Sequence, residues 1–186
     1  IGHARSLYIF DVIRRFLKFK KFKVRFVRNI TDIDDKIINR SFELKVEWKE
    51  LVEKYTSEYY DDLRGLGIPV VDAEPCATDN IEEMVEFIRL LIEKGFAYEA
   101  GGDVYFNVRK FSDYGKLSGQ SIEQLQKGAR IELSELKKDH LDFALWKRSK
   151  EDEPFWESPW GKGRPGWHIE CSVMSQKFLK TETPDI

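Results

Sequence analysis

The chain has 186 residues, of which 41% are hydrophobic and 34% are charged, and its formal net charge is -2 at pH 7. This composition is typical of a soluble globular protein and excludes a disordered or membrane-embedded chain. The near-neutral charge is not that of a dedicated nucleic-acid-binding module, so an RNA partner would make its main contacts elsewhere. Two distant cysteines, Cys76 and Cys171, predict no disulfide framework, and no secretory signal is present. A cytoplasmic location is therefore expected.

The first third of the chain predicts a helix, a strand and a second helix start. Apolar residues recur at helical spacing over residues 4–19, and lysines gather at the end of this range. Residues 24–28 are β-branched and aromatic, which predicts a strand. The polar side chains of residues 29–35 suit a helix start at the carboxyl end of that strand. In open α/β sheets this edge is where ligands bind.

The middle of the chain predicts two further helices and a hairpin. Helical spacing covers residues 48–63 and 84–92, and Gly95 is positioned to end the second of these helices. Residues 96–99 and 104–108 flank a Gly-Gly-Asp turn, which indicates a β-hairpin.

The last third predicts a capping box, a strand and a final helix. Ser121 and Gln124 have the capping-box spacing, which predicts a short helix through Leu125. Residues 142–147 predict a buried strand, and an amphipathic helix is expected from Trp167 onward.

Two candidate ligand sites lie near helix starts, and each has a structural alternative. Gly2 and His3 could hold a phosphate at a helix N-terminus, although such a pair is more often an ordinary cap. Thr31, with the carboxylates of Asp32, Asp34 and Asp35, could contact a small charged substrate. The same cluster could simply cap a helix.

Cys171 is the candidate metal ligand or nucleophile, because a thiol near a helix start is expected to have a lowered pKa. It could also be a small buried apolar residue. His168 and Glu170 are near in sequence, but a structural zinc site needs about four ligands, so other ligands would have to come from elsewhere. Trp167 is the favoured aromatic wall of a ligand site.

Other conspicuous side chains receive structural interpretations. Trp48 and Trp146 are expected in the core, and His140 is expected at the surface. The basic cluster that begins at Arg14 is interpreted as a solvated helix end rather than an RNA footprint.

Taken in order, three blocks resemble the cysteinyl-tRNA synthetase family. Residues 1–5 resemble the end of the class I His-Ile-Gly-His signature, and residues 27–38 resemble the family's block after the second strand. Residues 158–161 and 163–172 resemble its zinc-ligand block. The similarity runs essentially from end to end and is weakest between residues 111 and 141.

The resemblance implies an α/β fold: a class I synthetase Rossmann-like parallel sheet with helices on both faces and a connective α+β insertion, truncated at both ends. Residues 1–97 would form the first part of the catalytic domain, 98–141 the insertion, and 142–186 the return to the catalytic domain. The other zinc ligands, a lysine-rich loop and the anticodon-binding region are expected outside this chain.

The resemblance also implies roles for individual residues. Gly2 and His3 match the catalytic ATP-binding signature, and Mg²⁺ would accompany the ATP. Thr31 and Trp167 match residues that line the cysteine pocket, and Cys171 matches one ligand of a Zn²⁺ ion.

The implied activity is that of a cysteine-tRNA ligase, which activates L-cysteine with ATP and transfers it to tRNA. A zinc ion that binds the substrate thiolate would reject serine, because sulfur is the softer ligand. A monomeric protein is expected, and the isolated 186 residues are expected to be inactive. Two alternatives remain: the related cysteine ligase of mycothiol synthesis, which uses an amino-sugar acceptor, and a non-catalytic synthetase-like module.

Overall fold

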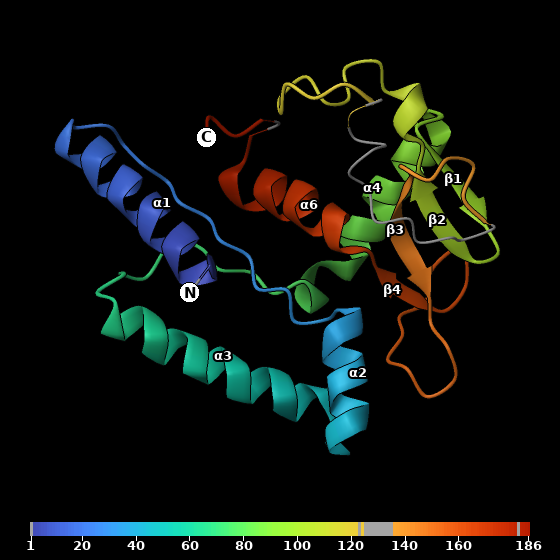
Figure 1. Cartoon of the computed structure of the whole chain (residues 1–186), viewed down its shortest axis with the longest axis horizontal. Coiled ribbons are helices and arrows are strands. Elements are labelled where there is room, and N and C mark those ends of the chain that lie inside the picture. The colour runs from blue at the N-terminus through green and yellow to red at the C-terminus, as the bar shows by residue number, and fades with distance from the viewer. Residues whose placement is uncertain (1, 123, 125–135, 182) are drawn as a thin grey trace. The chain divides into compact units, whose positions relative to one another are not determined.

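The computed structural model describes residues 2–122, 124, 136–181 and 183–186 (Figure 1). The chain divides into two compact units. Unit 1 comprises Ile1–Ala77 and Met174–Ile186, and unit 2 comprises Thr78–Val173. Ile1 of the N-terminal signature lies outside the described residues. So do residues 123 and 125–135 of the expected insertion, which include Leu125, where the short helix was expected to end.

Unit 1 contains three helices before residue 77, at the places where the sequence predicts helices or a helix start. They are α1 (Gly2–Phe19), α2 (Asp35–Leu44) and α3 (Trp48–Gly65). Asp34 caps α2, because its carboxylate accepts a hydrogen bond from the Lys36 N–H at 2.8 Å. The capping interpretation of this acidic cluster is therefore confirmed.

An extended segment over residues 26–30 runs parallel to residues 72–77. Isolated bridges join Val27 to Ala73 and Ile30 to Cys76. The strand predicted near residues 24–28 is thus an extended segment in the structure, and residues 72–77 are its parallel neighbour. Within the described ranges this is the extent of parallel pairing, and the expected parallel Rossmann sheet is not confirmed. A parallel sheet needs ladders that extend over several residues, and two bridges do not form one.

The sequence predicts that Arg14 belongs to a solvated basic cluster, but in the structure its side chain is buried. It is 8% exposed, and its guanidinium donates a hydrogen bond to the Val70 carbonyl at 3.0 Å. Arg14 faces the loop before Asp72, whose carboxylate lies 3.8 Å from the guanidinium. One face of α1 therefore carries a buried cation that anchors the helix within unit 1.

Unit 2 is built on an antiparallel sheet of four strands in the order β1-β2-β3-β4. The strands are β1 (Ala97–Ala100), β2 (Asp103–Phe106), β3 (Phe143–Arg148) and β4 (Gly163–Pro165). Gly101 and Gly102 form the tight turn between β1 and β2, with φ values of 65° and 90°. Positive φ at both central positions is typical of a hairpin turn, so the predicted hairpin is confirmed.

The strand expected over residues 142–147 is β3, and it pairs antiparallel with the hairpin strand β2. The resemblance instead implied that residues 142–186 return to the catalytic domain, whose sheet was expected to be parallel. Whether 98–141 forms a separate insertion stays a prediction.

The core of unit 2 is apolar. Trp146, Met84 and Ile88 are each 0% exposed. Helix α4 (Ile81–Glu93) contributes two of these side chains and packs against β1 and β4. The prediction that Trp146 is a core residue is confirmed, whereas Trp48 is only half-buried at the start of α3.

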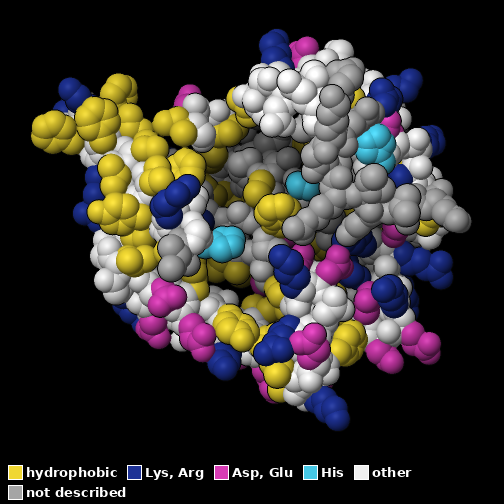
Figure 2. Space-filling model, viewed as in Figure 1, with side chains coloured by type: hydrophobic (Ala, Val, Ile, Leu, Met, Phe, Trp, Pro, Cys, Tyr) yellow, Lys and Arg dark blue, Asp and Glu magenta, His cyan; other side chains and the backbone are white. Residues whose placement is uncertain are grey.

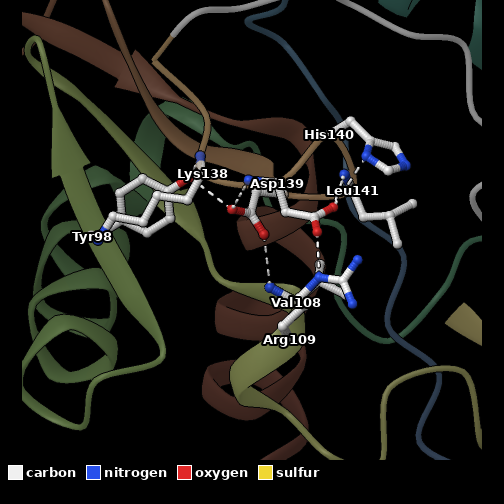
Figure 3. Close-up of polar contacts among 8 residues, drawn as sticks. Tyr98, Val108, Arg109, Lys138, Asp139, His140 and Leu141 are labelled. Carbon is white, nitrogen blue, oxygen red and sulfur yellow. Dashed lines mark hydrogen bonds and ion pairs between the residues drawn. The ribbon is translucent and has the colours of Figure 1, made fainter.

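A buried carboxylate joins the hairpin to the turn before β3. Asp142 is 1% exposed and accepts hydrogen bonds from the Tyr98 hydroxyl at 2.7 Å and from the Val108 N–H at 2.9 Å. Val108 begins the 3₁₀ helix η2 (Val108–Lys110). Figure 3 shows the neighbouring Asp139, which forms an ion pair with Arg109. A satisfied buried network of this kind fixes the relative positions of its members.

Shorter features agree with their predictions. The Ser121 N–H donates to the Gln124 side chain at 2.9 Å, and the Gln124 N–H donates to the Ser121 hydroxyl at 3.3 Å, which is the predicted capping box. His140 is exposed, as expected.

The 3₁₀ helix η1 (Thr78–Asn80) precedes α4, and α6 (Trp167–Leu179) is the helix expected from Trp167 onward. Among the residues described, none of the helices has the length and apolar character to span a membrane.

Candidate functional site

Unit 1 contains a cavity of about 650 Å³ whose walls come from α1, α2, α3 and residues 28–31. His3 and Thr31, two of the residues predicted to bind ligand, line this cavity. Gly2 is the first residue of α1 and adjoins His3. The fold therefore brings the α1 N-terminus and the polar segment after Ile30 to one cavity, although they lie far apart in sequence.

The N-terminus of α1 has the chemistry that suits an anion. The helix has 18 residues, and its first turn contains no acidic side chain. Free N–H groups and the helix dipole give such an end a partial positive charge. Gly2 and His3 are exposed, and no atom lies within 4 Å of the position a Cβ would take at Gly2. The backbone at this position is thus open to close approach by a ligand.

Thr31 is held at the end of the paired segment. The Ile30 N–H donates to the Pro75 carbonyl at 2.9 Å, and the Ala77 N–H donates to the Ile30 carbonyl at 3.0 Å. Thr31 is half-buried, and its hydroxyl accepts a hydrogen bond from the Asn29 side chain at 3.4 Å. Its hydroxyl is consequently placed by backbone pairing on one side and by the start of α2 on the other.

Basic side chains outnumber acidic ones around the cavity. Arg28, Lys36 and Arg40 line it, and Asp62 is its acidic member. Arg28 and Arg40 pair with carboxylates outside the lining, Glu74 and Glu43 respectively. The two arginine charges are therefore balanced, and the attraction for an anion comes from the N-terminus of α1.

In unit 2, β4 and the start of α6 position the other two candidate residues. The Gly166 N–H donates to the Leu145 carbonyl of β3 at 2.8 Å. A Cβ at Gly166 would lie 2.0 Å from the Ala144 carbonyl oxygen, so only glycine allows this approach. The first residue of α6, Trp167, follows directly, so its backbone position is set by this contact with β3.

Trp167 and Cys171 lie on one face of α6, because residues four apart in a helix are neighbours. Trp167 is 59% exposed and Cys171 is also exposed, whereas Ile169 and Glu170 are buried. The His168 ring lies 4.8 Å from the Phe143 ring and 5.1 Å from the Trp167 ring, measured between centroids. An aromatic surface therefore adjoins an accessible thiol.

The titration of these side chains differs from the expectation for a helix start. Desolvation raises the pKa of the Cys171 thiol, and the carboxylate of Glu170 raises it further. The lowered pKa expected from the helix N-terminus is therefore not found. Desolvation also lowers the pKa of His168, with a smaller contribution from Lys147, so this imidazole is held neutral.

The described residues do not supply a complete metal site. They contain no group of three or more His, Cys, Asp or Glu side chains arranged to hold an ion. Cys171 can contribute one thiolate, and a tetrahedral zinc site needs about four ligands. A zinc site that used Cys171 would therefore need ligands from other residues.

Sequence reasoning missed the cluster of Arg28, Glu74 and Tyr59 beside the cavity. Arg28 and Tyr59 line the cavity, and both contact Glu74. Arg28 lies inside a recognised sequence block, but no local pattern connects it to a carboxylate 46 residues away.

The whole chain matches a known family model. Residues 1–186 match the model described as the tRNA synthetases class I (C) catalytic domain.

Curated relatives resemble the chain over its full length. It is 60% identical, over 100% of this chain, to the cysteine-tRNA ligase of Thermodesulfovibrio yellowstonii. It is 59% identical over 97% of the chain to the enzyme of that name from Maridesulfovibrio salexigens, and 54% identical over 100% to that from Clostridioides difficile. The chain covers 39%, 37% and 40% of these three relatives, respectively.

Proposed function

This chain belongs to the family of class I (C) tRNA synthetase catalytic domains, and from that premise we propose that it forms part of a cysteine-tRNA ligase. The observation that carries the proposal is the identity of 60% with a cysteine-tRNA ligase across the entire chain. The substrates would be L-cysteine, ATP with Mg²⁺, and tRNA. The tRNA would be bound mainly by regions outside this chain, and we expect the whole enzyme to be a cytoplasmic monomer.

The ATP end of the reaction is assigned to the start of α1. Gly2 and His3 open a helix without acidic residues in its first turn, so its N–H groups can stabilise phosphate charge. The cysteine carboxylate attacks the α-phosphorus of ATP, the bond to the bridging oxygen breaks, and pyrophosphate leaves. Positioning and charge stabilisation are the contributions expected of the protein in such a step.

The cysteine end is assigned to Thr31, Trp167 and Cys171. Thr31 would offer a hydroxyl to the substrate, and Trp167 an aromatic surface. The Cys171 thiolate would be one ligand of a Zn²⁺ ion whose other ligands lie elsewhere. Bound zinc would select a substrate thiolate over a hydroxyl, because zinc prefers the softer sulfur ligand.

The acceptor step needs no covalent enzyme intermediate. A terminal ribose hydroxyl of tRNA attacks the carbonyl carbon of cysteinyl adenylate, and AMP leaves. Cys171 would be unavailable as a nucleophile while it holds a metal.

Cysteine-dependent ATP–pyrophosphate exchange, measured on the full natural polypeptide, tests the proposal. We expect exchange with cysteine, little exchange with serine, and transfer to tRNA rather than to an amino sugar. Transfer to the amino sugar alone would assign the chain to the mycothiol pathway. No exchange with any amino acid would indicate a binding module.

Metal analysis of the same polypeptide tests the role of Cys171. We expect Cys171→Ser to lose zinc and cysteine affinity while ATP affinity is largely kept. Cys76→Ser, a change at the other cysteine of the chain, serves as the matched control and should keep its zinc. Full zinc content in Cys171→Ser would contradict the assignment.

A further inference from the structure

We propose that Glu74 is a positioning residue for amino-acid binding, which acts through Arg28 and Tyr59 to hold Thr31 in the cavity of unit 1. This inference rests on the proposed function and deepens it. Glu74 is absent from the cavity lining, so it would act only through its neighbours.

The contacts of Glu74 define a small buried cluster. Its Oε1 accepts a hydrogen bond from Arg28 Nε at 2.5 Å and from the Tyr59 hydroxyl at 3.2 Å. The side chains of Arg28 and Glu74 are only 11% and 9% exposed. The Arg28 guanidinium carbon also lies 5.4 Å from the centroid of the Tyr59 ring, within the range of a cation–π contact.

The cluster joins three separate segments of unit 1. Arg28 belongs to the extended segment that leads to Thr31, Glu74 to the segment paired with it, and Tyr59 to α3. Beside the side-chain contacts, the Arg28 N–H donates to the Ala73 carbonyl at 3.1 Å. Side chain and backbone thus fix the same short strand-like segment, three residues before Thr31.

Burial makes the carboxylate hard to replace. A buried ion pair that loses one partner leaves an uncompensated charge. Burial also raises the pKa of Tyr59. Arg28 opposes this effect and the Glu74 carboxylate adds to it, and the net pKa is raised, so the hydroxyl keeps the proton that it donates. Without the carboxylate, the Arg28 guanidinium would be expected to turn toward the cavity or toward water, and the segment before Thr31 would lose its side-chain anchor.

A purely structural role makes a different prediction. A variant that only unfolds part of the protein lowers the active fraction and hence the apparent kcat, but the remaining active molecules keep their KM values. A displaced Thr31 raises the KM for the amino acid in particular, because its contact is with that substrate.

The experiment uses ATP–pyrophosphate exchange with the full natural polypeptide and the variant Glu74→Gln. We expect the KM for cysteine to rise about tenfold, since small displacements of a binding group have large effects, while the KM for ATP changes less than about twofold. Tyr59→Phe, a milder change, should raise the cysteine KM about two- to threefold. Glu86→Gln, which breaks an exposed ion pair with Arg89 on α4, is the matched control and should leave both KM values unchanged.

A double-variant cycle tests whether Glu74 acts through Thr31. In a Thr31→Ala background, Glu74→Gln should raise the cysteine KM less than about twofold further, because the group that it positions is already gone. Additive effects would overturn the proposal.

The remaining outcomes are distinguishable. If the wild-type protein shows cysteine-dependent exchange and Glu74→Gln leaves the cysteine KM unchanged, or raises the cysteine and ATP KM values equally, the positioning role fails and the proposed function stands. If the wild-type protein shows no exchange with cysteine, both proposals fail. Should Glu74→Gln not fold, an unchanged cysteine KM in Tyr59→Phe would overturn the positioning role.

Discussion

In unit 2 the side chains of Trp146, Met84 and Ile88 are 0% exposed, whereas in unit 1 helix α1 leaves Phe16, Phe19 and Phe22, just beyond its end, 56%, 76% and 64% exposed. Figure 2 shows hydrophobic side chains gathered over this part of α1, at the left of the view. The same range of the chain is attached by polar contacts. Arg14 donates to the Val70 carbonyl at 3.0 Å and Arg15 donates to the Gly67 carbonyl at 2.7 Å.

The difference shows that the two regions are stabilised differently, the sheet of unit 2 by apolar burial and helix α1 of unit 1 by a few hydrogen bonds. Apolar burial is favourable in proportion to area and is hard to remove by a single polar change. Attachment through a few hydrogen bonds depends on individual donors, each of which contributes about 1 kcal/mol. We therefore expect α1 to open more readily than the sheet of unit 2, although α1 carries the candidate ATP-binding residues.

The largest effect is expected from Gly166→Ala, which would separate strands in unit 2. A Cβ at this position meets the Ala144 carbonyl oxygen at 2.0 Å and its carbon at 2.7 Å, and a backbone neighbour cannot move aside cheaply. We expect the free energy of unfolding to fall by more than about 4 kcal/mol, measured by urea denaturation. Gly65→Ala, where no atom lies within 4 Å, is the control and should be neutral or slightly stabilising. A stable Gly166→Ala protein would show that β4 can move away from β3.

A smaller loss of stability, confined to unit 1, is expected from Arg14→Ala. The change removes a buried donor to the Val70 carbonyl, and we expect a loss of about 1–3 kcal/mol. Hydrogen exchange should accelerate in α1 and leave β3 unaffected. Lys18→Ala, at an exposed position of the same helix, should change neither the free energy of unfolding nor hydrogen exchange. Equal acceleration in both units after Arg14→Ala would contradict the division into separately stabilised parts.

The smallest effect concerns acid stability in unit 2. Burial by itself would raise the pKa of Asp139, but the Leu141 N–H, Arg109 and His140 outweigh it and lower the pKa below the ordinary value of 3.8. The charged form is favoured by folding, so its contribution is present above pH 3.8 and disappears as the pH falls through the lower folded pKa.

We expect this contribution to be at most about 1 kcal/mol, since the partner Arg109 is exposed. Asp139→Asn should show a shallower loss of stability than wild type below pH 3.8. Urea denaturation at several pH values measures the difference. Parallel curves would mean that the ion pair contributes nothing.

Local patterns predicted much of this fold. Helical spacing located α1, α3 and α4, and the Gly-Gly-Asp turn located the hairpin, because these features depend on residues close in sequence. The capping role of Asp34 depends on Lys36, two residues away, and was equally accessible.

Long-range features escaped sequence reasoning. The pairing of β3 with β2 joins strands about forty residues apart, and its antiparallel direction is not encoded in either strand alone. Arg14 was assigned to a solvated cluster, since its charge and its neighbours resemble a surface helix end. Only the loop carbonyl of Val70 makes its burial favourable.

The candidate site also has features that the sequence predicts and features that only the tertiary structure decides. Sequence blocks by themselves determined the family, the candidate residues Gly2, His3, Thr31, Trp167 and Cys171, and the expected chemistry of a thiol ligand and a helix N-terminus. Tertiary structure decided that His3 and Thr31 share a cavity, and that Cys171 is accessible with a raised pKa. It also decided that Glu74 supports Arg28 from 46 residues away. The physical reason is that side-chain identity is local, whereas burial, proximity and electrostatic environment are created when distant segments pack together.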